Sequence, residues 1–239
     1  MTATLYIVGV GPGDPELITR KAFHILETTP VIATPKGSRN GNSTALSIVE
    51  QAMDISSREV THLYFPMQKI HKKNGPSTDV QEAWDDAAEQ IIEFLEQGKD
   101  VVFPTLGDPA IYSTGYYLYE TVLSRKPDIR VEFVPGIAAM SSCSAATGVP
   151  ICLGDDKLAV IPATFAAGEI RDTLQNFDTV VLMKVHRVLD QLIELLGELD
   201  LLDHAILVER AGMKDECIHK NLAKITDEVH YFSTLIVRK

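Results

Sequence analysis

The chain of 239 residues is 45% hydrophobic and 23% charged, which is typical of folded globular proteins and not of disordered ones. Its formal net charge of -11 disfavours a general role on nucleic acid or on an anionic membrane surface, because both partners need a cationic footprint. The three cysteines, Cys143, Cys152 and Cys217, lie far apart without CxxC spacing, so neither a disulfide framework nor a zinc site is predicted.

The N-terminus reaches a strand-like apolar run, residues 5–8, almost at once. It lacks the basic segment, apolar stretch and small-residue cleavage site of a signal peptide. No later stretch of the sequence is long and apolar enough to span a bilayer. We therefore expect a cytoplasmic protein in a reducing compartment.

Short apolar, β-branched runs alternate with longer helical patterns, which predicts an α/β protein. The spacing between the runs leaves room for crossover helices. The predicted strands are residues 4–9, 30–34, 60–65, 100–104, 130–134, 157–162, 178–184, 205–209 and 231–237.

Two helices are predicted in the first half of the chain. The first should begin after Asp14, which can cap free N–H groups, with Pro15 at its first position, and run to about Glu27. The second is predicted over residues 79–97, because apolar residues recur there at helical spacing before Gly98.

The segment between these helices, residues 68–77, is polar and basic and contains Gly-Pro, which indicates an exposed loop. A boundary between two lobes is expected within residues 115–130, because a Lys-Pro-Asp turn there precedes a new round of strands and helices.

Residues 7–15 read as a strand, a glycine-rich turn and a helix start, and glycines in such a turn let the backbone approach a ligand closely. The segment fails the dinucleotide fingerprint, because Asp14 stands where the third glycine of GxGxxG belongs and no acidic residue ends the next strand. A nicotinamide cofactor is therefore disfavoured. The alternative is a tight turn without any ligand.

Two further segments place small or polar residues directly after strands. Residues 103–113 contain Gly-Asp-Pro at a position that lies on the carboxyl edge of an α/β sheet, where ligands usually bind. Asp108 is also a candidate cap for the next helix. Residues 134–146 contain Pro-Gly and a run of small residues, which suits either close helix packing or a flat ligand.

Together these three segments resemble the tetrapyrrole methylase family, whose members carry a GxGPGD turn, a GDP segment and a PG-containing turn in this order. The resemblance extends over nearly the whole chain and includes residues 182–184 and 208–212. Residues 34–36, 64–67 and 231–233 resemble the branch that methylates precorrin-2 or cobalt-factor II at C20.

The resemblance implies two αβα lobes, assigned to residues 1–117 and 118–239, with the active site in the cleft between them and usually a homodimer. It also implies S-adenosylmethionine as the methyl donor, with S-adenosylhomocysteine as its product. Carried over by motif, the cofactor-binding residues are Pro12, Leu106, Gly107, Asp108, Ile111, Ala138, Ala139, Met183 and Ala211.

The family pattern does not supply a general base here, because relatives that methylate uroporphyrinogen end the second strand in an aspartate and this chain has Pro35. Tyr112, Glu209 and Lys36 are candidates for catalysis by their expected nearness to the cleft. No protein nucleophile is required, since an electron-rich meso carbon can attack the sulfonium methyl group directly, so alignment is the main contribution expected of the protein.

A substrate with acetate and propionate groups needs basic side chains to bind its carboxylates. Because the chain is acidic overall, its basic residues are candidates for this role. The candidates for substrate binding are Lys36, Arg39, Lys72 and Lys73. Lys69 and His71 lie in the same basic loop as Lys72 and Lys73 and are further candidates. The alternative for this loop is a solvated basic surface.

The seven histidines are scattered along the sequence, so no metal site is predicted. A hydrolase is disfavoured because a GxSxG elbow is missing from the sequence. The rival functions are methylation of another tetrapyrrole carbon or of a protein side chain, as in the diphthamide branch, and non-catalytic tetrapyrrole binding.

Overall fold

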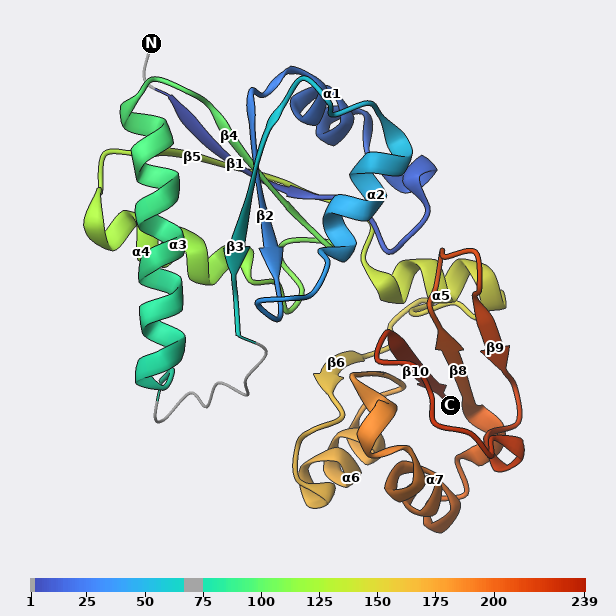
Figure 1. Cartoon of the computed structure of the whole chain (residues 1–239). Coiled ribbons are helices and arrows are strands. Elements are labelled where there is room, and N and C mark those ends of the chain that lie inside the picture. The colour runs from blue at the N-terminus through green and yellow to red at the C-terminus, as the bar shows by residue number, and fades with distance from the viewer. Residues whose placement is uncertain (1–2, 67–74) are drawn as a thin grey trace. The chain divides into compact units, whose positions relative to one another are not determined.

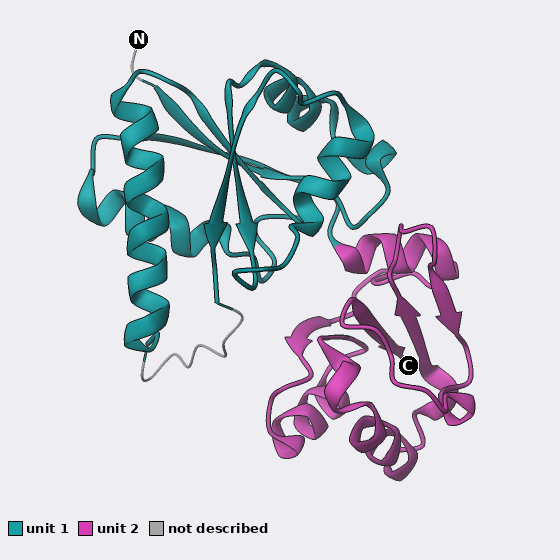
Figure 2. Cartoon of the chain, in the orientation of Figure 1, with its two compact units in different colours: residues 1–138 teal, residues 139–239 magenta. Residues whose placement is uncertain are grey.

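A computed structural model describes residues 3–66 and 75–239 of the chain. The protein divides into two compact units, Met1–Ala138 and Ala139–Lys239, which Figure 2 distinguishes by colour. Each unit is built around its own five-stranded sheet.

The first unit contains a parallel sheet in the order β3-β2-β4-β1-β5. Its strands are β1 (Thr4–Gly9), β2 (Val31–Lys36), β3 (Glu59–Tyr64), β4 (Val101–Thr105) and β5 (Arg130–Val134). Its helices are the 3-10 turn η1 (Pro15–Leu17), α1 (Arg20–Thr28), α2 (Thr44–Ala52), α3 (Thr78–Glu96) and α4 (Gly115–Arg125).

Helices cover both faces of this sheet, α3 and α4 on one and α1 and α2 on the other (Figure 1). Residues within one strand alternate between the two cores: Leu5 and Ile7 pack with α3 and α4, whereas Val8 packs with α1 and α2. Alternate side chains of a strand point to opposite faces, so continuous apolar strands are required in a sheet covered twice.

The second unit contains a mixed sheet in the order β6-β7-β10-β8-β9. Its strands are β6 (Leu158–Pro162), β7 (Thr179–Met183), β8 (Ala205–Glu209), β9 (Cys217–His219) and β10 (Ser233–Arg238). Its helices are α5 (Ala139–Thr147), α6 (Ala167–Asn176), α7 (Leu189–Glu198) and the 3-10 turns η2 (Val185–Arg187), η3 (Leu202–His204) and η4 (Leu222–Lys224).

Helices again cover two faces, α6 and α7 on one and α5 on the other. The predicted α/β class with two αβα bodies is therefore confirmed. Nine predicted strands lie within about two residues of observed ones. The short strand β9 was not predicted. Among the described residues, no helix is long and apolar enough to cross a membrane.

The boundary expected at 117/118 differs from the division after Ala138. The reason is β5, which pairs in parallel with β1 through five residue pairs and therefore belongs to the first sheet, together with α4 that precedes it.

The prediction of one helix from Asp14 to about Glu27 is wrong at its start. Asp14 Oδ1 accepts the N–H of Glu16 at 2.9 Å, but this cap opens only the three-residue turn η1. The backbone is extended at Ile18, and Thr19 then caps α1 by accepting the N–H of Ala22 at 3.2 Å. Thr19, five residues after Asp14, is therefore the residue that caps the α-helix.

Candidate functional site

The turns that leave β1, β4 and β5 meet at the carboxyl edge of the first sheet (Figure 1). The strand β1 lies between β4 and β5, and all three run in the same direction, so their carboxyl ends are neighbours. This edge is where ligands bind in open parallel sheets.

Three glycines, one from each turn, are in direct backbone contact. A Cβ atom on Gly9 would lie 2.6 Å from the carbonyl oxygen of Gly107, and one on Gly136 would lie 2.3 Å from the same oxygen. Neither distance is possible for a real side chain, so Gly9 and Gly136 are required by the packing of the protein on itself. We call Gly9, Gly107 and Gly136 the glycine junction.

Hydrogen bonds lock the first turn to the second. Gly11 N–H donates to the carbonyl of Gly107 at 3.2 Å, and Gly107 N–H donates to that of Gly11 at 2.8 Å. Both glycines have positive φ, +78° and +73°, a conformation that other residues adopt at a cost.

Asp108 ties the second turn to the third. Its Oδ1 accepts the N–H of Ala110 at 2.8 Å, and its Oδ2 accepts the N–H of Gly136 at 2.9 Å. The idea that Asp108 caps the next helix is wrong, because α4 begins only at Gly115, whose N–H donates to Ser113 Oγ at 2.9 Å. The carboxylate instead brings together turns that are 28 residues apart.

The structure brings most predicted cofactor residues of the first unit together on these turns. Gly107 and Ala138 are buried, whereas Leu106 and Ile111 are only partly buried and leave some apolar surface beside the turns. Pro12 is buried in the first turn.

The remaining predicted cofactor residues belong to the second unit. Ala139 begins α5, Met183 ends β7 and Ala211 follows β8. Met183 and Ala211 pack in the same apolar cluster, which α5 covers.

Left-handed backbone follows both of these strands. Lys184 has φ +62° and Arg210 has φ +52°, and burial lowers the pKa of Lys184 below its ordinary value. Non-glycine residues that are held in this conformation are often found at functional sites.

The catalytic candidates differ in the chemistry open to them. Tyr112 has φ +51° and is 49% exposed, and burial of the remainder raises the pKa of its hydroxyl, which therefore stays protonated at neutral pH. Glu209 is engaged through both oxygens, since His219 Nε2 lies 2.7 Å from Oε1 and the His230 N–H donates to Oε2.

Two cations predicted to bind substrate stand at the same edge of the first sheet. Lys36 ends β2, and the Arg39 guanidinium lies 4.8 Å from the ring centroid of Tyr64, which ends the adjacent strand β3. Burial and then the nearby Lys36 charge lower the pKa of His62. Lys72 and Lys73, like Lys69 and His71, lie outside the described residues.

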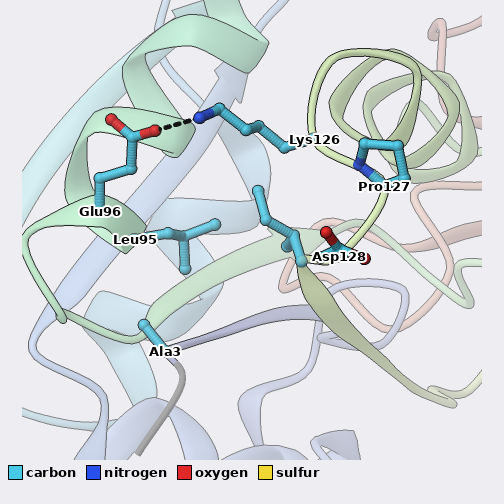
Figure 3. Close-up of a pocket in the computed structure, with 7 residues that line it drawn as sticks. Ala3, Leu95, Glu96, Lys126, Pro127 and Asp128 are labelled. Atoms are coloured by element: carbon cyan, nitrogen blue, oxygen red, sulfur yellow. Dashed lines mark ion pairs between the residues drawn. The ribbon is translucent and has the colours of Figure 1, made fainter.

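The depression drawn in Figure 3 lies at the opposite, amino-terminal edge of the sheet, where Lys126 pairs with Glu96 at 2.6 Å. It has a volume of about 230 Å³, and none of the predicted site residues line it. A larger depression of about 920 Å³ over η1, α1 and α2 does not include them either. The candidate site therefore rests on the turns and not on either depression.

Gly9 and Gly136 lie in segments that the sequence marks as candidates, but their contact with Gly107 and the bond from Gly136 to Asp108 were not predicted. The available signal was a glycine two residues after each of the three strands, at Gly11, Gly107 and Gly136.

Comparison with known proteins shows a match over residues 4–226 to the family described as Tetrapyrrole (Corrin/Porphyrin) Methylases. The chain is similar to a precorrin-2 C(20)-methyltransferase from Sinorhizobium sp, with 36% identity over 96% of this chain and 93% of that protein. It is also similar to the cobalt-precorrin-2 C(20)-methyltransferase of Salmonella typhimurium, with 32% identity over 100% and 98% of the two chains.

Among solved structures, the chain resembles uroporphyrin-III C-methyl transferase from Thermus thermophilus complexed with S-adenyl homocysteine. The TM-score is 0.69 with 21% identity, and the match covers 99% of this chain and 98% of that one. At this identity the likeness shows a shared fold.

The glycine junction predicts the effect of one added methyl group. Gly136→Ala forces the turns apart, so we expect the free energy of unfolding to fall by about 1–3 kcal/mol or more in urea titrations. The control is Gly168→Ala in α6, where a Cβ meets nothing within 4 Å, and it should be neutral or stabilising by up to about 1 kcal/mol. Equal losses from both changes would contradict the contact.

The bond between the second and third turns predicts that Asp108→Asn is destabilising. Asparagine keeps one acceptor oxygen and turns an amide N–H group toward a backbone N–H, which should cost about 1–3 kcal/mol. Asp54→Asn is the control, because Asp54 Oδ1 accepts the Ser56 N–H at 2.9 Å within an exposed turn. Thermal unfolding midpoints that fall by the same amount would refute the bridging role.

Proposed function

The chain belongs to the tetrapyrrole methylase family, and on that premise we propose that it transfers a methyl group from S-adenosylmethionine to C20 of precorrin-2 or cobalt-precorrin-2. Membership of the family makes the chain a methyltransferase. The choice of C20 is supported by two relatives of that activity, each more than 30% identical over nearly the full length of both proteins.

The observation that carries the proposal is the glycine junction with its Asp108 bridge. The three segments that resemble the family in sequence are also the three turns that meet at one edge of the first sheet. Backbone groups of these turns lie beside the partly exposed apolar side chains of Leu106 and Ile111. A donor with an apolar adenine face and several polar groups suits such a surface.

We propose the following donor contacts, many of them through backbone atoms: Pro12, Leu106, Gly107, Asp108, Ile111 and Ala138 of the first unit, and Ala139, Met183 and Ala211 of the second. Bound S-adenosylmethionine supplies an electrophilic methyl group. The chain's own part is to hold the two reactants in line, which is worth several kcal/mol in a reaction between two bound molecules.

Lys36 and Arg39 are proposed to bind the carboxylates of the macrocycle. Both stand at the carboxyl edge of the sheet that carries the glycine junction. They provide local positive charge in a chain whose net charge is -11. Lys72 and Lys73 remain proposed partners of the same carboxylates on sequence grounds.

The proposal assigns no protein base to the transfer step. The Tyr112 hydroxyl is protonated at neutral pH and suits hydrogen-bond donation to the substrate. Glu209 is committed to His219 and to the His230 backbone, and Lys36 suits a carboxylate better than a proton-accepting role. A homodimer remains part of the proposal on the family resemblance alone, and a cytoplasmic location remains part of it on the sequence features given above.

The reaction itself is tested with labelled S-adenosylmethionine and either precorrin-2 or cobalt-precorrin-2. We expect one methyl group per macrocycle, located at C20 by NMR. A methyl group at another carbon would overturn the branch assignment. Macrocycle binding without any methyl transfer would instead favour a carrier protein.

The assignment of Lys36 and Arg39 predicts a selective defect. Lys36→Ala and Arg39→Ala should each raise the KM for the macrocycle by about 10- to 150-fold, because one charge-assisted hydrogen bond is worth about 1.5–3 kcal/mol. The affinity for S-adenosylhomocysteine, measured by calorimetry, should not change. Lys126→Ala at the opposite edge of the sheet is the matched control. Wild-type KM values in both variants would remove these residues from substrate binding.

A further inference from the structure

A second chemical cluster lies on the β8–β9 hairpin of the second unit. Cys217 is the direct cross-strand partner of Glu209, and His219 lies two residues further along β9. Residues at this spacing share one face of a hairpin. Ile218 packs in the cluster that α5 covers, on the other face of the sheet, which is consistent with this arrangement.

The three side chains converge on one point. His219 Nε2 lies 2.7 Å from Glu209 Oε1, and one carboxylate oxygen, the Cys217 Sγ and one ring nitrogen all lie within 4.8 Å of one another. In a tetrahedral zinc site with bond lengths of about 2.0–2.3 Å, the ligand atoms are separated by about 3.5 Å. Small side-chain rotations therefore suffice to surround an ion.

We propose that Glu209, Cys217 and His219 form a binding site for a zinc-like divalent ion, with the fourth position open to solvent. Oxygen, nitrogen and sulfur together suit an ion of intermediate softness, and three protein ligands with one open position is a common zinc arrangement. None of the three ligands is among the residues assigned to the methyl donor, although Ala211 follows Glu209 in the loop between β8 and β9. The proposal does not depend on methyl transfer.

The surroundings hold the three ligands in place. The His230 N–H donates to Glu209 Oε2 and leaves Oε1 directed toward His219. The loop between the strands is braced by the Arg210–Asp215 ion pair and by the Gly212 N–H, which donates to Glu216 Oε2 at 2.8 Å. Outer hydrogen bonds of this kind orient metal ligands.

Binding exchanges a proton for the ion. A bound ion is held by a carboxylate, a neutral imidazole and a thiolate. The Cys217 thiol therefore releases its proton to solvent, and the His219 ring binds through one nitrogen and keeps its proton on the other. No metal site was predicted from the sequence, because β9, which brings Cys217 and His219 beside Glu209, was not predicted.

The site is tested in the wild-type protein by the rate at which its cysteines react with iodoacetamide, followed by peptide mass spectrometry. Cys152 is an internal control, because it is exposed in the same unit and lies outside the cluster. Burial raises the pKa of Cys143 to about 12, so that thiol should stay unreactive. One equivalent of Zn²⁺ should slow alkylation of Cys217 at least tenfold and leave Cys152 unchanged. Equal rates at Cys217 with and without Zn²⁺ would overturn the proposal.

Variants and a spectroscopic probe separate ligation from general shielding. His219→Ala should abolish the protection of Cys217, whereas His24→Ala on α1 should keep it. One equivalent of Co²⁺ should give a thiolate-to-cobalt absorption band in the near ultraviolet that Cys217→Ser removes and Cys152→Ser retains. A band that survives Cys217→Ser, or protection that survives His219→Ala, would refute the assigned ligands.

Discussion

The close contact of Gly9, Gly107 and Gly136 is the constraint on which the first unit depends. Parallel strands bring three turns to one edge of the sheet. The backbones of these turns can touch only because glycine has no side chain. Asp108 then joins the second turn to the third. Contacts within the protein itself set the positions of these turns, and a reaction driven by alignment requires groups that are positioned in this way.

These contacts connect the packing to the proposed chemistry. A methyl group that moves directly from donor to carbon needs no protein nucleophile, so the surface has to position two molecules and little else. The positive φ of Gly11 and Gly107 and the bridge of Asp108 are structural features of the turns themselves. In the proposed function, Lys36 and Arg39 supply local positive charge for an anionic ring in a chain that is acidic overall.

Local patterns in the sequence predicted most of the fold, because apolar β-branched runs mark strands that are covered on both faces, as in β1 and β8. The bounds of these two strands and of the edge strand β5 were predicted without error. Pairing between distant segments was not predictable in the same way. The pairing of β5 with β1 moved the boundary between the units. The sequence offered Asp108 as a candidate helix cap or ligand residue, but not its bond to Gly136, 28 residues away. Likewise β9, only three residues long, carries too little pattern to be recognised, so its grouping of Cys217 and His219 with Glu209 was missed.

The central claim is that the turns of the glycine junction bind the methyl donor, and hydrogen exchange of the wild-type protein with and without S-adenosylhomocysteine tests it most directly. The account predicts slower amide exchange in peptides that cover residues 105–111 and 135–138, with no change at residues 126–129 on the opposite edge of the sheet. Binding detected by calorimetry that leaves the exchange of residues 105–111 and 135–138 unaltered would contradict it.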